Sequence, residues 1–233
     1  ETPIHLICEN NNYQVLEHIL NSLSLPAIDA IDFNKTNING ESPIHIICKN
    51  GNEKMLGIIL DKINLINQAK SDSSMENILD SSKINFNLKD NKGRTPMHLI
   101  CMNSDNKRVL NVLLEKLSES EKSKIDFNIE DDVGNTPIHY ICMGNNDFHL
   151  SLIYEKLSDS DKARINFNAL NYKGIAPIHY ISSNVNDKIL NIMLASDNDN
   201  VNFNLKDNSG DTPIHYICKK NNAHMLNIIF DAK

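Results

Sequence analysis

Hydrophobic residues along this chain recur at helical spacing, in pairs of short segments separated by polar residues. The second segment of the first two pairs has the spacing i, i+1, i+4, i+5, at Val15, Leu16, Ile19 and Leu20 and at Met55, Leu56, Ile59 and Leu60. Positions with this spacing fall on one face of an α-helix. The pattern therefore predicts paired amphipathic helices, each of which buries the face that these residues form.

A tetrapeptide related to Thr-Pro-Ile-His precedes the first helix of each pair. It occurs six times, at residues 2–5, 42–45, 95–98, 136–139, 176–179 and 212–215. Its hydroxyl can cap backbone N–H groups, and proline suits the first helical position because an N–H there has no partner. The histidine falls at the third helical position, where it can bond back to the cap. Six copies of one supersecondary unit are expected, with Ala176 weakening the fifth by about 1 kcal/mol.

Five of these motifs follow a second recurring spacing, in which Asn, then Asp or Asn, then Gly stand three residues apart. The glycines are Gly40, Gly93, Gly134, Gly174 and Gly210. Asn and Asp side chains bond to nearby backbone, and glycine adopts positive φ without strain. A tight turn is therefore predicted before each of these helix pairs.

Turn, capped helix, polar break and second helix together resemble the ankyrin repeat over nearly the whole chain. The resemblance implies an all-α solenoid of helix-turn-helix units joined by β-hairpin-like turns. The motif prolines recur every 36 to 53 residues, against about 33 for the family. Extended loops after the second helices are expected to hold the additional residues.

We expect a single ankyrin-repeat domain over residues 1–233 that is part of a longer protein, because the chain begins inside a unit. The predicted repeats cover residues 1–28, 29–83, 84–124, 125–164, 165–199 and 200–233. Pro26 is expected to end the second helix of the first repeat. A loop is predicted over 64–83, with one short helix capped by Ser73 or Ser74, and further short helices are predicted after Ser118 and Ser158.

Composition excludes several classes of function. The net charge of −7 and the lack of a basic stripe argue against binding to nucleic acid or to a membrane. His-x-x-Cys occurs five times, but two ligands per repeat do not make a zinc site, so a cap and a core residue are the better interpretation. The five cysteines are expected to be buried, reduced thiols of a reducing compartment. We find no catalytic motif, and we expect no cofactor, metal or small-molecule substrate.

The remaining candidate is a surface. The family resemblance places partners on a concave face formed by the turn tips and the first helices. Tyrosine, methionine and arginine are suited to such contacts because they bury a large area at a modest entropic cost. The candidate protein-binding residues are Arg94, Met102, Val133, Tyr140, Met143, Tyr172, Ile175, Tyr180 and Tyr216. Packing of the three first-helix tyrosines against the next turn is the alternative interpretation, whereas Val133, Tyr172 and Ile175 are expected to be exposed.

These observations favour a non-enzymatic, monomeric module that binds a protein or peptide. An excess of Asn, Ile and Lys indicates an AT-rich genome. Ankyrin proteins of such genomes often belong to intracellular microbes that deliver them into host cells. We therefore expect an effector that acts on host proteins. The expected location is cytoplasmic, with the host cytosol as the site of action after secretion. Two alternatives stay open: the targeting arm of a larger enzyme whose catalytic domain lies elsewhere, and an architectural spacer.

Overall fold

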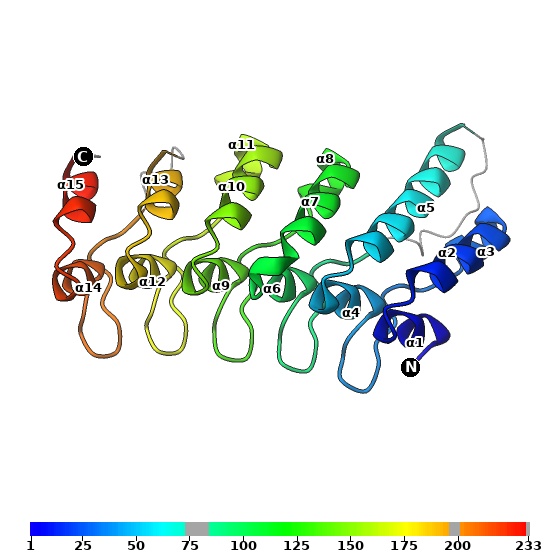
Figure 1. Ribbon diagram of the computed structural model, residues 1–233, viewed down its shortest axis with the longest axis horizontal. Helices are drawn as coiled ribbons and strands as arrows, with labels where there is room; N and C mark the ends of the chain where they lie inside the picture. Colours follow the sequence, from blue (N-terminus) through cyan, green and yellow to red (C-terminus); the bar gives the residue numbers. More distant parts are fainter. Residues whose placement is uncertain (73–83, 196–200, 232–233) are drawn as a thin grey trace. The chain divides into compact units, whose positions relative to one another are not determined.

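The computed structural model describes residues 1–72, 84–195 and 201–231, apart from the side chains of residues 71 and 72. Regular secondary structure within these residues is helical, without a strand (Figure 1). The helices are α1 (Pro3–Glu9), α2 (Tyr13–Ser22), α3 (Leu25–Asp29), α4 (Pro43–Asn50), α5 (Glu53–Asp72), α6 (Pro96–Cys101), α7 (Lys107–Lys116), α8 (Glu119–Lys122), α9 (Pro137–Met143), α10 (Asp147–Lys156), α11 (Asp159–Lys162), α12 (Pro177–Asn184), α13 (Asp187–Ala195), α14 (Pro213–Lys219) and α15 (Ala223–Asp231). A 3₁₀ turn, η2 (Ser104–Asn106), leads into α7. The predicted all-α architecture is confirmed.

Contacts divide the chain into two compact units. The first unit contains Glu1–Ile100 with Arg108–Lys124, and the second contains Cys101–Lys107 with Ile125–Lys233. In the first unit α1 packs against α2 and α4, and α5 packs against α2, α3 and α4. In the second unit α12 lies between α9 and α14, while α10 packs against α9 and α13. Within each unit, these helix pairs therefore stabilise their neighbours in sequence, as in a solenoid. The extent of a single domain stays a prediction.

Each motif proline begins a helix, and the motif histidine joins that helix to the next turn. In α4 the Ser42 N–H donates to His45 Nδ1 (3.1 Å), which leaves the proton on Nε2. That nitrogen donates to the carbonyl oxygens of Leu88 (3.0 Å) and Arg94 (3.1 Å) in the following turn. Burial lowers the pKa of His45 more than its surroundings raise it, which favours this neutral, single-donor form.

His139 and His179 repeat the bond from Nε2 to a carbonyl of the next turn. Nε2 of His139 lies 3.1 Å from the carbonyl of Ile175, and Nε2 of His179 lies 3.1 Å from that of Leu205. Ala176 keeps half of the cap, because its N–H still donates to His179 Nδ1 (3.0 Å). With no hydroxyl to accept it, the His179 N–H bonds to the Ala176 carbonyl (3.0 Å).

The turns stack on one another through backbone bonds. Asn91 N–H donates to the Asn39 carbonyl (3.0 Å) in the first unit, and Tyr172 N–H donates to the Val133 carbonyl (3.1 Å) in the second. The turn asparagines add a parallel row, in which Asn128 Oδ1 accepts from the N–H of the next turn's Asn166 (2.8 Å). These bonds fix the spacing of successive turn tips.

The prediction of a loop over 64–83 is wrong for residues 64–72, because α5 continues to Asp72. Ile63 and Ile66 extend its apolar face and are 5% and 2% exposed. Asn64 Nδ2 also donates to the Lys116 carbonyl (3.0 Å), and Lys70 pairs with the buried Asp29 (3.0 Å). The predicted cap at Ser73 or Ser74 lies outside the described residues.

The other local predictions had mixed outcomes. The short helices after Ser118 and Ser158 are confirmed as α8 and α11. Pro26 does not simply stop a helix: α2 ends at Ser22, and Pro26 lies in the first turn of α3, where its missing N–H has no consequence. Val15 was expected to be buried but is 40% exposed, whereas its counterpart Met55 is covered because α5 packs against several helices.

Candidate protein-binding surface

The nine candidate residues differ sharply in their exposure. Val133 and Tyr172 are 54% and 67% exposed, and Met102 and Met143 are 44% and 40% exposed. The other five, Arg94, Tyr140, Ile175, Tyr180 and Tyr216, are half-buried. Met102 follows α6 and Met143 ends α9, so both lie at the ends of first helices that point away from the turns. Val133 and Tyr172 lie together on adjoining turns, where the Tyr172 N–H donates to the Val133 carbonyl.

Arg94 lies in the first unit and is held by its own turn. Its Nε and a terminal nitrogen both donate to Asp90 Oδ2, at 2.9 and 2.6 Å. Burial alone would raise the pKa of Asp90, but hydrogen bonds from the side chain and backbone of Arg94 outweigh it and lower that pKa. Two charge-assisted bonds to one carboxylate oxygen strengthen this ion pair, which leaves Arg94 a structural role in its turn.

The three first-helix tyrosines are fixed by the turns beside them. Tyr140 donates its hydroxyl to Asp131 Oδ2 (2.5 Å), and Tyr216 donates to Asp207 Oδ2 (2.6 Å). The hydrogen bond to Asp207 raises the pKa of Tyr216 to about 12. Tyr180 instead accepts a bond from Asn171 Nδ2 (3.3 Å). These bonds support the alternative interpretation that the tyrosines pack against turns, and a direct role in binding stays a prediction.

Two of these rings also rest edge-on against a motif histidine of the preceding repeat. Tyr180 lies 6.4 Å from His139 and Tyr216 lies 5.7 Å from His179, measured between ring centroids, in T-shaped geometry. Ile175 was expected to be exposed but is half-buried. Its N–H donates to Asn171 Oδ1, and its carbonyl faces His139 Nε2. The framework that supports the turn tips is therefore heavily bonded.

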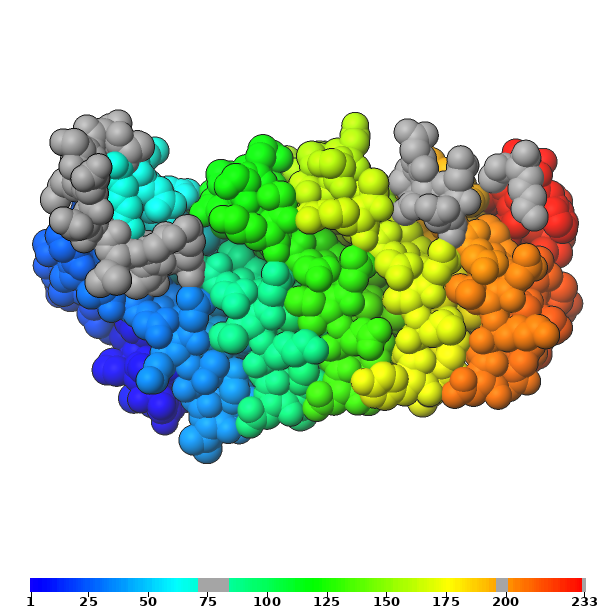
Figure 2. All heavy atoms as spheres, turned by 180° about the vertical axis from the view of Figure 1, so that it is seen from behind, coloured from blue at the N-terminus to red at the C-terminus, as the bar shows by residue number. Residues whose placement is uncertain are grey.

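Val133, Leu170 and Tyr172 form an exposed apolar group on two adjoining turns, here named the tip cluster. Leu170 is 43% exposed. The Tyr172 ring lies over Gly134, where a Cβ would approach Tyr172 Cδ1 to 2.6 Å, and Gly134 has φ of +79°. Glycine is thus required both for the turn and for the ring's approach. The turn ends of the second unit lie side by side along its lower edge (Figure 2).

Leu170 was missed by sequence reasoning. Its counterparts in the other turns are polar, namely Thr36, Lys89, Glu130 and Lys206. That polarity made the position look like part of a solvated turn. An apolar residue where every other copy is polar is the signal that could have identified it.

Charges on the two turns of the tip cluster are unequal. Glu130 and Asp132 are exposed on the first turn, and Lys173 is exposed on the second. Asp131 is 5% exposed, and its Oδ1 accepts from the N–H groups of Val133 (3.0 Å) and Asn135 (2.9 Å). The carboxylate of Asp131 is therefore part of the turn itself, and Glu130 and Asp132 present the outward negative charge.

His149 is a second feature that sequence reasoning missed. It is 1% exposed in α10, at the position that Met55 occupies in α5 and Ile189 in α13. Its Nε2 has no hydrogen-bond partner within the described part of the chain. Burial lowers the pKa of His149 to about 4, so this imidazole is a neutral core residue at ordinary pH.

The motif cysteines are arranged as core residues rather than as reactive groups. Cys8 and Cys48 are buried, and burial raises the pKa of the Cys8 thiol to about 12 and that of Cys48 further. Thiols with a raised pKa are weak nucleophiles and weak metal ligands at neutral pH. Cys218 was expected to be buried as well, but it is exposed near the end of α14. No disulfide joins the five cysteines, all of which the structure describes.

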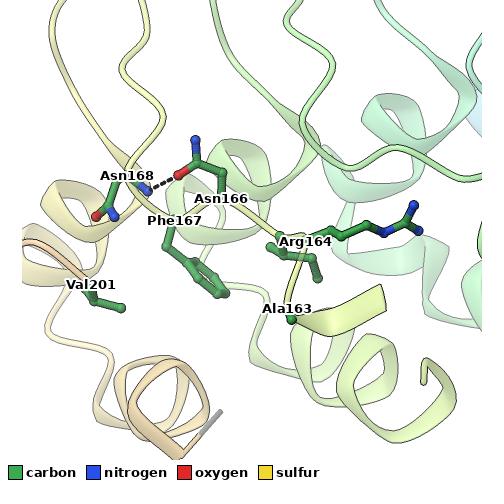
Figure 3. Close-up of a pocket in the computed structure, with 7 residues that line it drawn as sticks. Ala163, Arg164, Asn166, Phe167, Asn168 and Val201 are labelled. Carbon is green, nitrogen blue, oxygen red and sulfur yellow. Dashed lines mark hydrogen bonds between the residues drawn. The ribbon is translucent and has the colours of Figure 1, made fainter. Parts of the chain in front are cut away.

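Other kinds of site find little support in the described residues. A pocket of about 190 Å³ is lined by Phe167, Arg164, Val201 and their neighbours (Figure 3). Ligand pockets usually enclose about 300–1,000 Å³, so this one is small for an organic substrate. Within the described ranges, no group of three or more His, Cys, Asp or Glu side chains is placed to hold a metal ion. No helix there has the length and apolar character to cross a membrane.

Comparison with known proteins agrees with this geometry. A family model described as ankyrin repeats in three copies matches residues 4–116 and 63–164, which together exceed half of the chain. The fold is similar to that in the crystal structure of EF0377, an ankyrin repeat protein, with a TM-score of 0.67 and 14% identity over 97% of this chain and 95% of the other. No curated protein sequence matches the chain. The family model does not count the repeats here, so six stays a prediction, but the chain belongs to the ankyrin-repeat family.

Proposed function

We propose that the chain is a non-enzymatic module that holds a protein or peptide on the surface formed by its turn tips and first helices. Ankyrin repeats generally mediate protein–protein interaction, and the fold is typically non-catalytic. The observation that carries the proposal is the tip cluster, because Val133 and Tyr172 are more than half exposed on a framework of bonded turns. Exposed apolar side chains gathered on a rigid surface are typical of a protein-binding site.

Rigidity supports this proposal as much as exposure does. Tyr140, Tyr180 and the motif histidines are fixed by hydrogen bonds and ring contacts beneath the turns. A partner that contacts the tips therefore need not order them first, and binding avoids that entropic cost. We propose that the half-buried tyrosines support the contact and that Val133, Tyr172, Met102 and Met143 make it.

An affinity-capture experiment tests this function. The chain is compared with the double variant Val133→Ser/Tyr172→Ser and with Phe148→Ser, which removes an aromatic side chain that is 50% exposed on the second helix α10. The chain and Phe148→Ser should retain one common partner protein from a cytosolic extract, and the double variant should lose it. A double variant that retains every captured protein would contradict the proposal and favour a spacer.

We further propose that the protein is a cytoplasmic monomer and acts as an effector on host proteins after delivery by an intracellular microbe. The proposal is supported by the Asn, Ile and Lys content and by the cysteines, which form no disulfide and of which four are buried. Fractionation of infected cells should find the native protein in the host cytosol. Its confinement to the microbe would exclude the effector role and leave the binding function unaffected.

A further inference from the structure

We propose that the tip cluster receives a linear protein segment that carries a basic side chain next to apolar ones. This inference rests on the proposed function and specifies the chemistry of the partner. It follows from the apolar surface on the two turns, from the position of the carboxylates beside it, and from the backbone groups that the turns have already used.

The apolar part of the surface is formed by side chains from two turns. Tyr172 N–H donates to the Val133 carbonyl (3.1 Å), so these two residues are held as neighbours, and the Tyr172 ring covers Gly134. Leu170 stands two residues before Tyr172 on the same turn and is 43% exposed. A leucine, isoleucine or phenylalanine of a partner can bury exposed apolar surface of this cluster, which gives the segment its apolar requirement.

The charged part lies on the first of these two turns. Asp132 precedes Val133, is exposed, and forms no hydrogen bond or ion pair with any residue that the structure describes. Glu130 is also exposed on this turn. The one cation of the two turns, Lys173, follows Tyr172 on the other side of the cluster. The partner's lysine or arginine is therefore favoured at the Val133 end and disfavoured at the Lys173 end.

Backbone pairing does not explain the recognition. The Val133 N–H donates to Asp131, and the Val133 carbonyl accepts from Tyr172. The exposed Tyr172 hydroxyl and Asp132 carboxylate are side-chain groups that can meet a partner instead. Side chains, rather than an added strand, must carry the specificity, which is why the sequence of the segment matters.

Three synthetic peptides of about twelve residues test the inference with the whole chain. The first combines Lys and Arg with Leu and Phe, the second replaces its basic residues by Glu, and the third replaces its apolar residues by Ser. Binding is measured by fluorescence anisotropy at two salt concentrations. The basic, apolar peptide should bind at least about 10-fold more tightly than either control, and its affinity should fall as salt rises.

Single-residue variants test whether the peptide contacts the tip cluster. Tyr172→Ser should weaken binding of the basic, apolar peptide by about 10-fold or more. Asp132→Lys should weaken it by roughly 5- to 10-fold and improve binding of the acidic peptide. Phe148→Ser is the matched control and should leave every affinity unchanged. Because these side chains are exposed, circular dichroism should show the same helix content in all variants.

Each other outcome overturns the inference without deciding the proposed function. Equal or tighter binding of the acidic peptide in a Tyr172-dependent manner would show that the partner chemistry is wrong while the tip cluster still binds. Failure of all three peptides to bind would also overturn it, and the capture experiment would then decide the function independently. Self-association that Tyr172→Ser abolishes would identify a second copy of this chain as the occupant.

Discussion

Val185 offers the sharpest prediction about stability, because its backbone conformation does not suit its side chain. It ends α12 with φ of 59°, in the left-handed region. Gly51 occupies the equivalent position after α4, and Asn11, Asn145 and Asn221 occupy it elsewhere with φ of 53° to 59°. Left-handed backbone costs an ordinary L-residue about 1–2 kcal/mol, and a β-branched residue tolerates it poorly.

The same position controls a hydrogen bond. Asn11 Oδ1 accepts from Asn52 Nδ2 and Asn145 Oδ1 accepts from Asn186 Nδ2, both at 2.6 Å. The next member of this series is Asn222, whose Nδ2 is buried and has no partner within the described residues. Val185 cannot accept a bond, so its side chain leaves that amide unsatisfied. A buried unsatisfied polar group costs about 1–3 kcal/mol.

Val185→Asn should therefore stabilise the protein. Relief of strain contributes about 1–2 kcal/mol, and the new bond to Asn222 contributes about 0.5–1.5 kcal/mol. Lost apolar burial offsets roughly 1 kcal/mol, because Val185 is 40% exposed. The net gain is about 0.5–2.5 kcal/mol, which corresponds to about 1–10 °C in Tm for a chain of this size.

Two further variants separate the strain from the bond. Val185→Gly relieves the strain but supplies no acceptor, so its gain should be smaller than that of Val185→Asn. Gly51→Val should lower the free energy of unfolding by about 1–2 kcal/mol, because it creates the strain that Val185 has now. Urea unfolding, with hydrogen exchange over residues 177–195, measures both effects. The reasoning is refuted if Val185→Asn is neutral or destabilising while Gly51→Val costs nothing.

Three further predictions concern single side chains. His149→Met should stabilise the protein more at pH 5 than at pH 8. The folded-state pKa of about 4 lies below the ordinary value of about 6.5. Protonation of the unfolded state therefore costs stability as pH falls between those values, by about 3 kcal/mol in all. Equal pH profiles of the two proteins, measured by urea unfolding, would contradict this. Ala176→Thr should restore a hydroxyl cap and add about 1 kcal/mol, and an unchanged urea midpoint would show that the cap is already satisfied. Cys218 should react with a maleimide in the native protein within minutes while Cys48 stays protected, as mass spectrometry of the labelled peptides would show.

The sequence was sufficient for the architecture because each repeat carries the same local signals. The cap, the proline and the turn glycine all favour the same helix start, so six weak signals support one another. The motif histidine was placed correctly as a partner of the cap. Its second bond, from Nε2 to the next turn, depends on how repeats stack, and no local pattern specifies that distance.

The errors arise where packing overrides local pattern. Residues 64–72 look like a polar loop, but Ile63 and Ile66 continue the apolar face of α5, and that spacing was the overlooked signal. Val15 and Cys218 follow the motif yet are exposed, because burial depends on which elements pack against them. Motif position predicts a side chain's direction better than it predicts what covers it.

The candidate site was predictable only in part. Val133 and Tyr172 stand at turn tips, where side chains point outward whatever the partner, so their exposure followed from position. The restraint of Tyr140 and Tyr216 by acidic residues nine positions earlier required the folded turn. Leu170 required a comparison of all turns at one position rather than a motif.

Site-specific photo-crosslinking tests the central claim most directly. A photoreactive amino acid replaces Tyr172 in one variant and Phe148 in another, and each is irradiated in the cells where the protein acts. The account predicts a covalent adduct with one protein from position 172 and none with that protein from position 148. Adducts of equal yield at both positions, or an adduct from position 148 alone, would contradict a binding surface at the turn tips.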